Sequence, residues 1–352
     1  MIDYRAGLNE LPTYDVSEQE WQIKLNANES NLNLPPLVED RVMSCLSRIA
    51  FNRYPDQEMG DLQELIALNF NMLPENILVA NGSSEILEKL FFCFGGNGRK
   101  IVFPVPSFSM YGIYSKISDS SAVTVELESD YSLDAKKFAQ AVNDNDARLA
   151  VLCTPNNPTG NAIPIKDIEY IAQNIDCAFA IDEAYVEFYG ISAVSLIKKY
   201  PNLIVARTFS KAYGLAAARV GYMMADAQIT AQVAKACMPY HVNVMSLTVA
   251  GIVYQMRDEF VPRIQMYVSE RKRLLEALKE LPQLMVYPSE TNFILIKYAK
   301  ATELNAYLQE LKIGVRSFGN APRLINCLRI TVGTREENDR WFKALKAFVE
   351  RN

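Results

Sequence analysis

Residues 203–214, LIVARTFSKAYG, decide the fold class of this 352-residue chain. Their first half is a short, largely apolar stretch that predicts a buried β-strand. A turn follows at once, in which Lys211 stands among small, hydroxyl-bearing and aromatic residues. A lysine just beyond a buried strand can have its ammonium desolvated, which lowers its pKa and favours Schiff-base chemistry. The ordinary alternative is a surface lysine near a turn.

Similar short apolar runs recur along the chain and alternate with helical stretches. The helical spacing of apolar residues is clear over 37–50 and 59–70. Short strands between helices indicate βα units around a largely parallel sheet, and therefore an α/β fold. The predicted strands are 77–80, 100–103, 122–126, 149–153, 178–181 and 203–208.

The last hundred residues predict a second, smaller α/β unit. Apolar residues from Phe260 to Leu278 mark one long helix, interrupted or kinked near Pro262. Strand-like and helical patterns then alternate over 293–297, 303–311 and 328–332. A terminal helix is predicted to be buried through Trp341, Phe342, Leu345 and Phe348.

Composition excludes several classes of protein. With 36 Lys plus Arg against 41 Asp plus Glu, the net charge of −5 argues against nucleic acid as the main partner. No uncharged apolar run approaches 18 residues, so no membrane span is expected, and the N-terminus shows no signal peptide. The six cysteines form no Cys-x-x-Cys pair, as in reduced, cytoplasmic proteins. His241 is the only histidine, so no histidine-based triad or metal site is predicted.

Polar residues follow the predicted strands. Asp182 comes directly after 178–181, where α/β sheets place ligand contacts, although a helix N-cap is the alternative. Residues 154–160, TPNNPTG, are typical of a turn, and that plain interpretation is the stronger one for this motif alone. Residues 81–85, NGSSE, open a helix whose first N–H groups could bind a phosphate, or simply cap the helix. Thr208, Ser210 and Arg219 flank Lys211 and could hold the same phosphate.

The order of these motifs resembles the fold-type I aminotransferases over nearly the whole chain. Five segments are more narrowly similar to the histidinol-phosphate aminotransferase family: LNANE (25–29), RYPD (53–56), DEAYVEF (182–188), FSKAYGL (209–215) and CLRITVGT (327–334). The resemblance implies a large domain with a mostly parallel seven-stranded sheet between helices, and a small α/β domain built from the chain ends. The implied division is an N-terminal arm over 1–40, a large cofactor-binding domain over 41–255 and a small domain over 256–352.

The resemblance also implies pyridoxal 5′-phosphate as cofactor. Lys211 would form the Schiff base and shuttle the proton as general base and acid. Asp182 would pair with the pyridine nitrogen, Tyr185 and Asn157 would donate to the phenolic oxygen, and Phe108 would stack on the ring. Tyr54 would reach the cofactor phosphate from a neighbouring subunit, which implies a homodimer with shared active sites. The implied phosphate cradle is Gly82, Ser83, Ser84, Thr208, Ser210 and Arg219.

Substrate recognition would fall to Tyr14, Arg316 and Arg329, since guanidinium groups bind phosphate or carboxylate bidentately. The plain alternatives are a solvated loop charge for Arg316 and an outward-facing strand position for Arg329. The implied reaction is transamination of L-histidinol phosphate with 2-oxoglutarate, in histidine biosynthesis. Three positions depart from the family pattern: Ser84 replaces an acidic or amide residue, Phe108 a tyrosine, and His241, which we interpret as structural or substrate-proximal, an asparagine.

Other functions stay open on the same scaffold. An aromatic amino-acid aminotransferase or a phosphothreonine decarboxylase would share the cofactor chemistry. A dinucleotide-dependent dehydrogenase would share the parallel sheet, but residues 94–98, FGGNG, do not match Gly-x-Gly-x-x-Gly. A non-catalytic regulator would need an added DNA-binding segment, and we expect the stretch before Leu25 to be too short for one.

Overall fold

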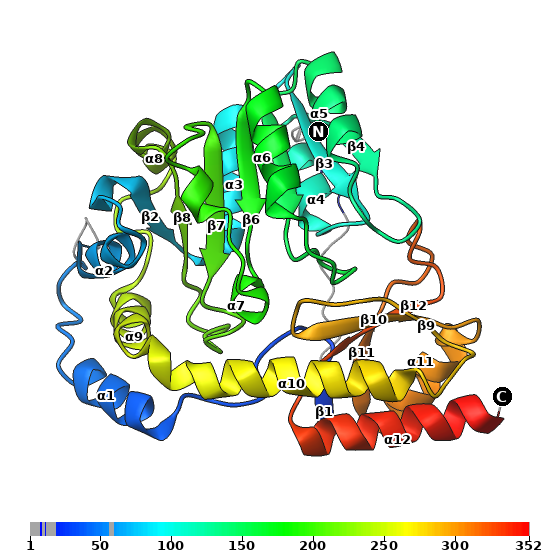
Figure 1. Cartoon of the computed structure of the whole chain (residues 1–352). Helices are drawn as coiled ribbons and strands as arrows, with labels where there is room; N and C mark the ends of the chain where they lie inside the picture. The colour runs from blue at the N-terminus through cyan, green and yellow to red at the C-terminus, as the bar shows by residue number, and fades with distance from the viewer. Residues whose placement is uncertain (1–7, 9–10, 12–18, 56–59, 352) are drawn as a thin grey trace, which may run out of the picture.

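The computed structural model describes residues 8, 11, 19–55 and 60–351, and its strands form two sheets (Figure 1). The larger sheet has seven strands in the order β2-β8-β7-β6-β5-β3-β4. Only the two pairs that involve β8 are antiparallel. The predicted α/β fold with a mostly parallel sheet is therefore confirmed. Its strands are β2 (Ile77–Ala80), β3 (Lys100–Val105), β4 (Ser121–Glu126), β5 (Leu149–Cys153), β6 (Ala178–Asp182), β7 (Leu203–Thr208) and β8 (Gly221–Met224).

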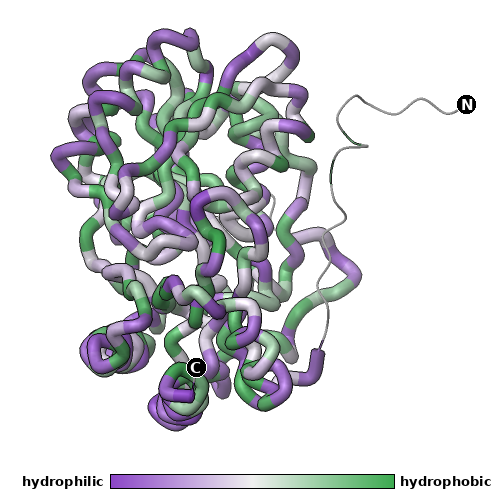
Figure 2. The backbone as a smooth tube through the Cα atoms, turned by 90° about the vertical axis from the view of Figure 1, so that its right-hand side faces the viewer, coloured by the Kyte–Doolittle hydropathy of each residue, from purple (hydrophilic) through white to green (hydrophobic). Residues whose placement is uncertain are grey.

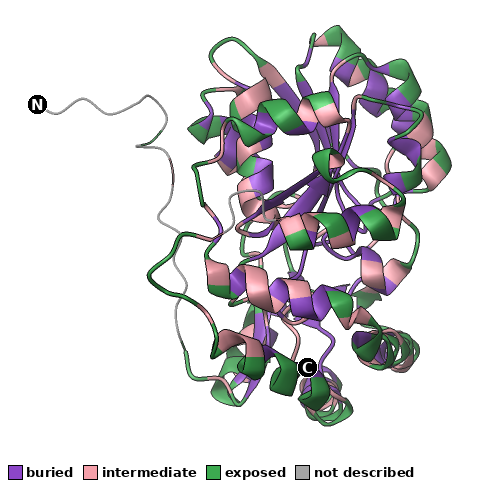
Figure 3. Cartoon of the chain, turned by 90° about the vertical axis from the view of Figure 1, so that its left-hand side faces the viewer, coloured by how far each residue is buried: buried purple, intermediate pink, exposed green. Residues whose placement is uncertain are grey.

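Both faces of this sheet are buried, as expected for parallel strands between helices. Along β7, Leu203 and Val205 pack into one apolar cluster while Ile204 and Ala206 pack into another on the opposite face. In Figure 3 the strands at the centre are buried and the surrounding helices are exposed on their outer sides. One face is covered by α1 (Pro36–Leu46), α2 (Gly60–Phe70), α5 (Ala135–Asp144), α6 (Ile165–Asn174) and α9 (Val244–Gln255), the other by α3 (Gly82–Phe94), α4 (Met110–Ile117) and α8 (Ala227–Ala234).

The smaller sheet joins the two ends of the chain. Its order is β1-β11-β12-β10-β9, and β1 pairs in parallel with β11, so Ile23 faces Ile313. Its apolar cluster includes the fully buried Trp341. The strands are β1 (Ile23–Leu25), β9 (Met285–Val286), β10 (Phe293–Lys297), β11 (Ile313–Ser317) and β12 (Cys327–Thr331); the helices are α10 (Val261–Leu278), α11 (Ala301–Glu310) and α12 (Arg335–Arg351).

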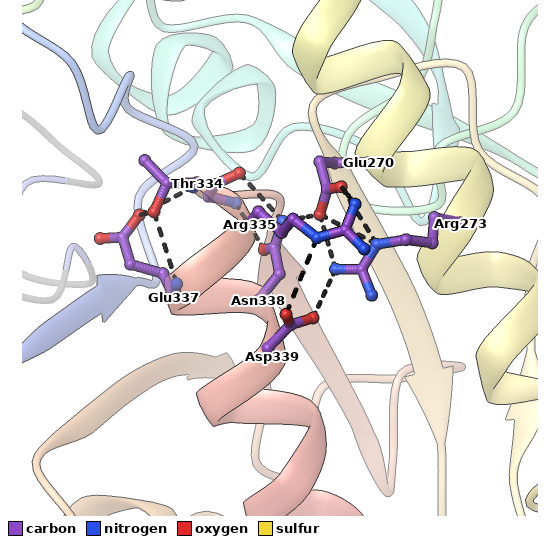
Figure 4. A network of polar contacts seen from close by, with 8 residues as sticks. Glu270, Arg273, Thr334, Arg335, Glu337, Asn338 and Asp339 are labelled. Carbon is purple, nitrogen blue, oxygen red and sulfur yellow. Dashed lines mark hydrogen bonds and ion pairs between the residues drawn. The ribbon is translucent and has the colours of Figure 1, made fainter.

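A polar network ties α10 to the start of α12 (Figure 4). Arg273 lies 2.6 Å from Glu270 and 2.7 Å from Asp339. The fully buried Asn338 donates to Glu270 at 3.0 Å and accepts from the backbone N–H of Gly333 at 2.8 Å. The network therefore fixes the turn that follows β12.

The remaining elements are short. They are the helix α7 (Val186–Tyr189) and 3-10 turns at Pro74–Asn76, Val194–Leu196 and Arg257–Phe260. Hydrophilic residues gather on the outer turns of the chain (Figure 2). Among the described residues, no helix is long and apolar enough to cross a membrane.

Two details differ from the sequence-based expectations. The predicted interruption near Pro262 is wrong, because α10 begins at Val261 and Pro262 lies in its first turn, where a missing N–H costs nothing. The strands β1, β8, β9 and β11 were not predicted. They are two to five residues long and gain their stability from pairing rather than from a local pattern.

Candidate active site

The predicted functional segments lie at the carboxyl ends of neighbouring strands of the large sheet. They follow β2, β3, β5, β6 and β7. The register pairs Cys153 with Asp182, and it pairs Gly221 with both Ala80 and Thr208. Segments that are distant in sequence therefore meet at one edge of the sheet, which is where open α/β sheets bind ligands.

Asp182, the last residue of β6, is a buried acid with few partners. Its Oδ2 accepts a hydrogen bond from Tyr111 Oη at 2.9 Å, and its Oδ1 accepts from the N–H of Ala184 at 3.2 Å. Burial raises its pKa to about 6, against the effects of these bonds and of the Lys211 charge. The helix N-cap interpretation is wrong, because Tyr185 is the N-cap of α7. A buried carboxyl of this kind suits a cationic nitrogen on a ligand.

Tyr111 was missed by sequence reasoning. It lies within α4 and is fully buried, so its only sequence signal is an aromatic residue on an apolar helix. Its ring meets Phe108 edge-on, with centroids 5.6 Å apart. Tyr111 therefore supports both Asp182 and the predicted stacking residue.

Lys211 is partly buried beside these groups. Its Nζ donates to the carbonyl of Ala27 at 3.1 Å and lies 6.0 Å from the centroid of the Tyr185 ring. Burial, together with the charges of Arg329 and Arg219, lowers its pKa to about 8, and the charges of Glu29 and Asp182 oppose this shift. The neutral amine, which nucleophilic attack requires, is therefore far more populated near neutral pH than it is for an ordinary lysine.

Tyr185 and Asn157 are both held by residues from the small-sheet side. The Tyr185 hydroxyl accepts a hydrogen bond from Asn28 Nδ2 at 2.9 Å. Asn157 Oδ1 accepts from Arg329 Nη1 at 2.6 Å. Burial raises the pKa of Tyr185, so its phenol keeps its proton and can donate it. Asn28 lies within the LNANE segment, but the sequence predicted no role for that residue.

The turn at 154–160 also has the plain structural role that its sequence favours. Asn156 donates to the Pro106 carbonyl at 3.0 Å and to Thr159 Oγ1 at 2.6 Å. Gly160 has φ +85°, and a Cβ there would lie 2.8 Å from the Ser289 hydroxyl. The turn is thus a scaffold that presents Asn157.

The predicted phosphate-binding residues converge in the structure. Ser210 Oγ lies 3.0 Å from Thr208 Oγ1 and 3.4 Å from Arg219 Nη1. Gly82 opens α3 with φ +79°, and a Cβ on it would lie 2.9 Å from Arg219 Nη2. The capping interpretation also holds in part, since Glu85 accepts from the N–H of the N-cap Asn81 at 2.6 Å. The structure thus brings together a cationic cradle at a helix N-terminus, made by Gly82, Ser83, Ser84, Thr208, Ser210 and Arg219, which fits a phosphate.

The predicted substrate-binding arginines lie opposite each other. Arg316 on β11 pairs in register with Arg329 on β12. Arg329 is only 8% exposed and donates to the Asn26 carbonyl at 2.8 Å, so the outward-facing interpretation is wrong. Arg316 is exposed and stands on a strand rather than in a loop. The predicted contribution of Tyr14 lies outside the described residues.

Tyr54 and His241 lie together at the surface near α3. Tyr54 is 81% exposed and its ring stacks on Tyr240 with centroids 4.7 Å apart. The ring nitrogens of His241 lie 3.0 Å from the carbonyls of Met238 and Val79. His241 therefore has a structural role here, bracing the strand that leads into the cradle.

Comparisons with known proteins agree with this geometry. The model of the family "Aminotransferase class I and II" matches residues 20–345. The histidinol-phosphate aminotransferase of Thermoanaerobacter sp. (strain X514) is 38% identical over 98% of each chain. A solved histidinol-phosphate aminotransferase from Sinorhizobium meliloti, in complex with pyridoxal-5′-phosphate, has TM-score 0.86 at 24% identity, over 95% of this chain and 92% of that one.

A second solved structure bears on one of the alternative functions. The L-threonine-O-3-phosphate decarboxylase of Porphyromonas gingivalis has TM-score 0.81 at 25% identity, over 93% of this chain and 99% of that one. Its identity of 25% to this chain is lower than the 38% of the histidinol-phosphate aminotransferase from Thermoanaerobacter. The chain belongs to the histidinol-phosphate aminotransferase family, within the class I and II aminotransferases.

Proposed function

We propose that this aminotransferase exchanges the amino group between L-histidinol phosphate and 2-oxoglutarate, as in histidine biosynthesis, with pyridoxal 5′-phosphate as cofactor. One observation carries the proposal: the lysine with a lowered pKa, the buried acid and the cationic cradle share one sheet edge. These are the three groups that this cofactor requires of a protein. The bound cofactor supplies a carbonyl for the amino group and a ring that accepts electrons.

The residues of this chain take the following roles in the proposal. Lys211 holds the cofactor and then moves the proton at its own Nζ. Asp182 keeps the ring nitrogen protonated, because a buried carboxylate is stabilised by a cation beside it. Tyr185 and Asn157 donate to the phenolic oxygen, and Phe108 stacks on the ring. The cradle residues bind the phosphate, with the N-terminus of α3 contributing its first N–H groups.

The substrate anions fall to the arginine pair. Histidinol phosphate carries a phosphate, and glutamate carries two carboxylates. Arg316 and Arg329 face each other across β11 and β12, so one cationic pair serves both half-reactions. We propose that Tyr14 completes this site.

The proposed assembly is a homodimer in which Tyr54 reaches the cofactor phosphate of the neighbouring subunit. Large apolar side chains are exposed on the segments that flank Tyr54 and its stacking partner Tyr240, which favours an interface there. They are Met43, Phe51, Met238, Tyr240 and Met245, between 37% and 73% exposed.

We further propose the domain division 1–40, 41–255 and 256–352 and a cytoplasmic location. The pairing of β1 with β11 and the start of α10 at Val261 support a small domain built from both ends of the chain, whereas α1 spans the boundary at 40 and packs on the large sheet. The six free cysteines support the cytoplasmic location.

Single-turnover kinetics test the function. The purified protein should be yellow, glutamate alone should convert the cofactor to its amino form, and histidinol phosphate should react much faster than phenylalanine or phosphothreonine. Comparable rates with phenylalanine would favour an aromatic aminotransferase, and release of carbon dioxide would favour a decarboxylase. A Lys211→Ala variant that still turns over would exclude the mechanism.

A further inference from the structure

Three consecutive residues of the N-terminal segment cross the site, and each binds a different functional side chain. The carbonyl of Asn26 accepts from Arg329, and the carbonyl of Ala27 accepts from Lys211 Nζ. Asn28 departs from this pattern, because its side chain donates to the Tyr185 hydroxyl at 2.9 Å. Asn28 is 1% exposed and has φ +55°, a left-handed conformation that asparagine tolerates better than most residues.

The orientation of the Asn28 amide is set by Thr331 on β12. The backbone N–H of Asn28 donates to Thr331 Oγ1 at 2.9 Å, so that oxygen already acts as an acceptor. The single proton of the Thr331 hydroxyl points to Asn28 Oδ1 at 3.2 Å. Asn28 Oδ1 is thereby the acceptor, and Nδ2 is left to face Tyr185. Asn292, also buried, anchors the loop by donating to the Asn28 carbonyl at 3.1 Å.

This arrangement decides where the Tyr185 proton points. A phenol has one proton, and its oxygen already accepts one from Asn28. Among the described residues, no hydrogen bond uses Tyr185 Oη as the donor. The proton is therefore kept for an acceptor that arrives with the ligand.

We propose that Asn28 and Thr331 are positioning residues that act through Tyr185, directing its hydroxyl proton to the phenolic oxygen of the cofactor. The small sheet thus controls a hydrogen bond at the ring, although neither residue touches the ring itself. This inference rests on the proposed function, since it requires the cofactor ring beside Tyr185.

A hydrogen bond donated to the phenolic oxygen stabilises negative charge there and weakens that oxygen's hold on the proton shared with the adjacent nitrogen. The pH at which the visible absorption of the bound cofactor changes therefore reports whether Tyr185 donates. Loss of one such charge-assisted bond should raise this midpoint by about one pH unit.

The decisive variants are Thr331→Val and Thr331→Ser. Both substitutions introduce an uncharged side chain, but valine removes the hydroxyl that orients Asn28, whereas serine keeps it. We expect Thr331→Val to raise the midpoint and Thr331→Ser to leave it as in the wild type. Thr291→Val is the matched control, because Thr291 is an equally buried hydroxyl that bonds to Ser289 and the Phe293 carbonyl rather than to Asn28.

Asn28→Asp tests independently whether Tyr185 donates its hydroxyl proton to the cofactor. Its carboxylate replaces the donor with an acceptor and should draw the Tyr185 proton away, raising the midpoint. In a Tyr185→Phe background this substitution should have a much smaller effect, because the hydroxyl it acts through is gone. Thermal melting of each cofactor-free variant checks that it is folded.

Wild-type midpoints in Thr331→Val and Asn28→Asp, with a raised midpoint in Tyr185→Phe, would overturn the positioning role and leave the proposed function standing. An unchanged midpoint in Tyr185→Phe would overturn both the positioning role and the placement of Tyr185 at the ring. Failure of the proposed function would look different, as a purified protein without cofactor absorption or as a cofactor-loaded enzyme that does not prefer histidinol phosphate.

Discussion

The Arg329 guanidinium donates a 2.6 Å hydrogen bond to the side-chain oxygen of Asn157, and this bond joins the two sheets of the molecule. Arg329 belongs to β12 of the small sheet, and Asn157 follows β5 of the large one. Because the bond occupies Asn157 Oδ1, the amide group that Asn157 offers to a ligand is its Nδ2. The proposed binding of anions by Arg329 and the proposed ring contact of Asn157 are therefore linked through one pair of side chains.

Replacing Arg329 by lysine should weaken both half-reactions. Lysine keeps the charge but loses the planar guanidinium, which binds Asn157 and the Asn26 carbonyl and is proposed to bind an anion as well. We expect kcat/KM for histidinol phosphate and for glutamate to fall by about 10- to 100-fold each. Arg148→Lys, at an exposed arginine paired with Asp146, is the control. A loss confined to one substrate would contradict the use of Arg329 for both anions.

Capture of pyridoxal phosphate by the cofactor-free protein should report the pKa of Lys211. Only the neutral amine attacks, so the rate should rise with pH up to about 8 and then level off. Arg329→Gln removes a cation that lowers this pKa and should move the midpoint up. Asp182→Asn removes an anion that raises it and should move the midpoint down. Stopped-flow absorbance measures the rate, and a midpoint near the ordinary value of 10.5 would refute the desolvation of Lys211.

Asp182→Asn should stabilise the cofactor-free protein at neutral pH. The folded pKa of about 6 lies above the ordinary 3.8, so the stabilisation from protonated Asp182 is complete below pH 3.8 and is lost as pH rises through 6. Above that pH the wild type holds an ionised buried carboxyl, whereas asparagine stays neutral and still accepts from Tyr111. Chemical denaturation at pH 8 should favour the variant by about 3 kcal/mol, with little difference near pH 4. The same variant should bind the cofactor more weakly, and equal stability at pH 8 would contradict the buried charge.

Mixed dimers test the proposed homodimer and its shared active sites. A chain with Lys211→Ala and a chain with Tyr54→Ala should each be impaired as homodimers. If Tyr54 acts across the interface, one site of each mixed dimer receives both natural residues. Random exchange of subunits should then restore about one quarter of the wild-type sites. If the exchanged mixture is no more active than the two separate homodimers added together, Tyr54 does not act on the active site of the partner subunit.

Gly221→Ala should disrupt the proposed phosphate cradle. A Cβ at Gly221 would lie 2.3 Å from the Ser83 nitrogen and 2.5 Å from the Gly82 carbonyl carbon, and neither backbone atom can rotate away. We expect at least a roughly 10-fold loss of cofactor affinity and a lower melting temperature. Gly251→Ala, within α9, is the control, because its Cβ would meet nothing within 4 Å. Wild-type affinity in Gly221→Ala would show that the cradle tolerates displacement of α3.

The sequence alone predicted the alternation of strands and helices and the polar residues at the strand ends. The strands 149–153, 203–208 and 293–297 have the predicted bounds. Local periodicity reports which side of an element is buried, and the carboxyl ends of parallel strands share one edge, so Asp182 and Lys211 could be placed at that edge without a structure. The role predicted for Asn157 rested on the resemblance to the family.

Only the tertiary structure decided how those residues are partnered. The short strands β1 and β11 exist because they pair with each other, and the hydrogen bond from the Asn28 N–H to Thr331 Oγ1 spans 303 positions. In the sequence, Tyr111 cannot be distinguished from an ordinary core residue. Only the structure shows that its hydroxyl donates a hydrogen bond to Asp182. The sequence thus determined the chemistry present at the sheet edge, because that depends on residue type and local pattern. The direction of each proton and the orientation of each arginine depend on contacts between segments that only folding brings together.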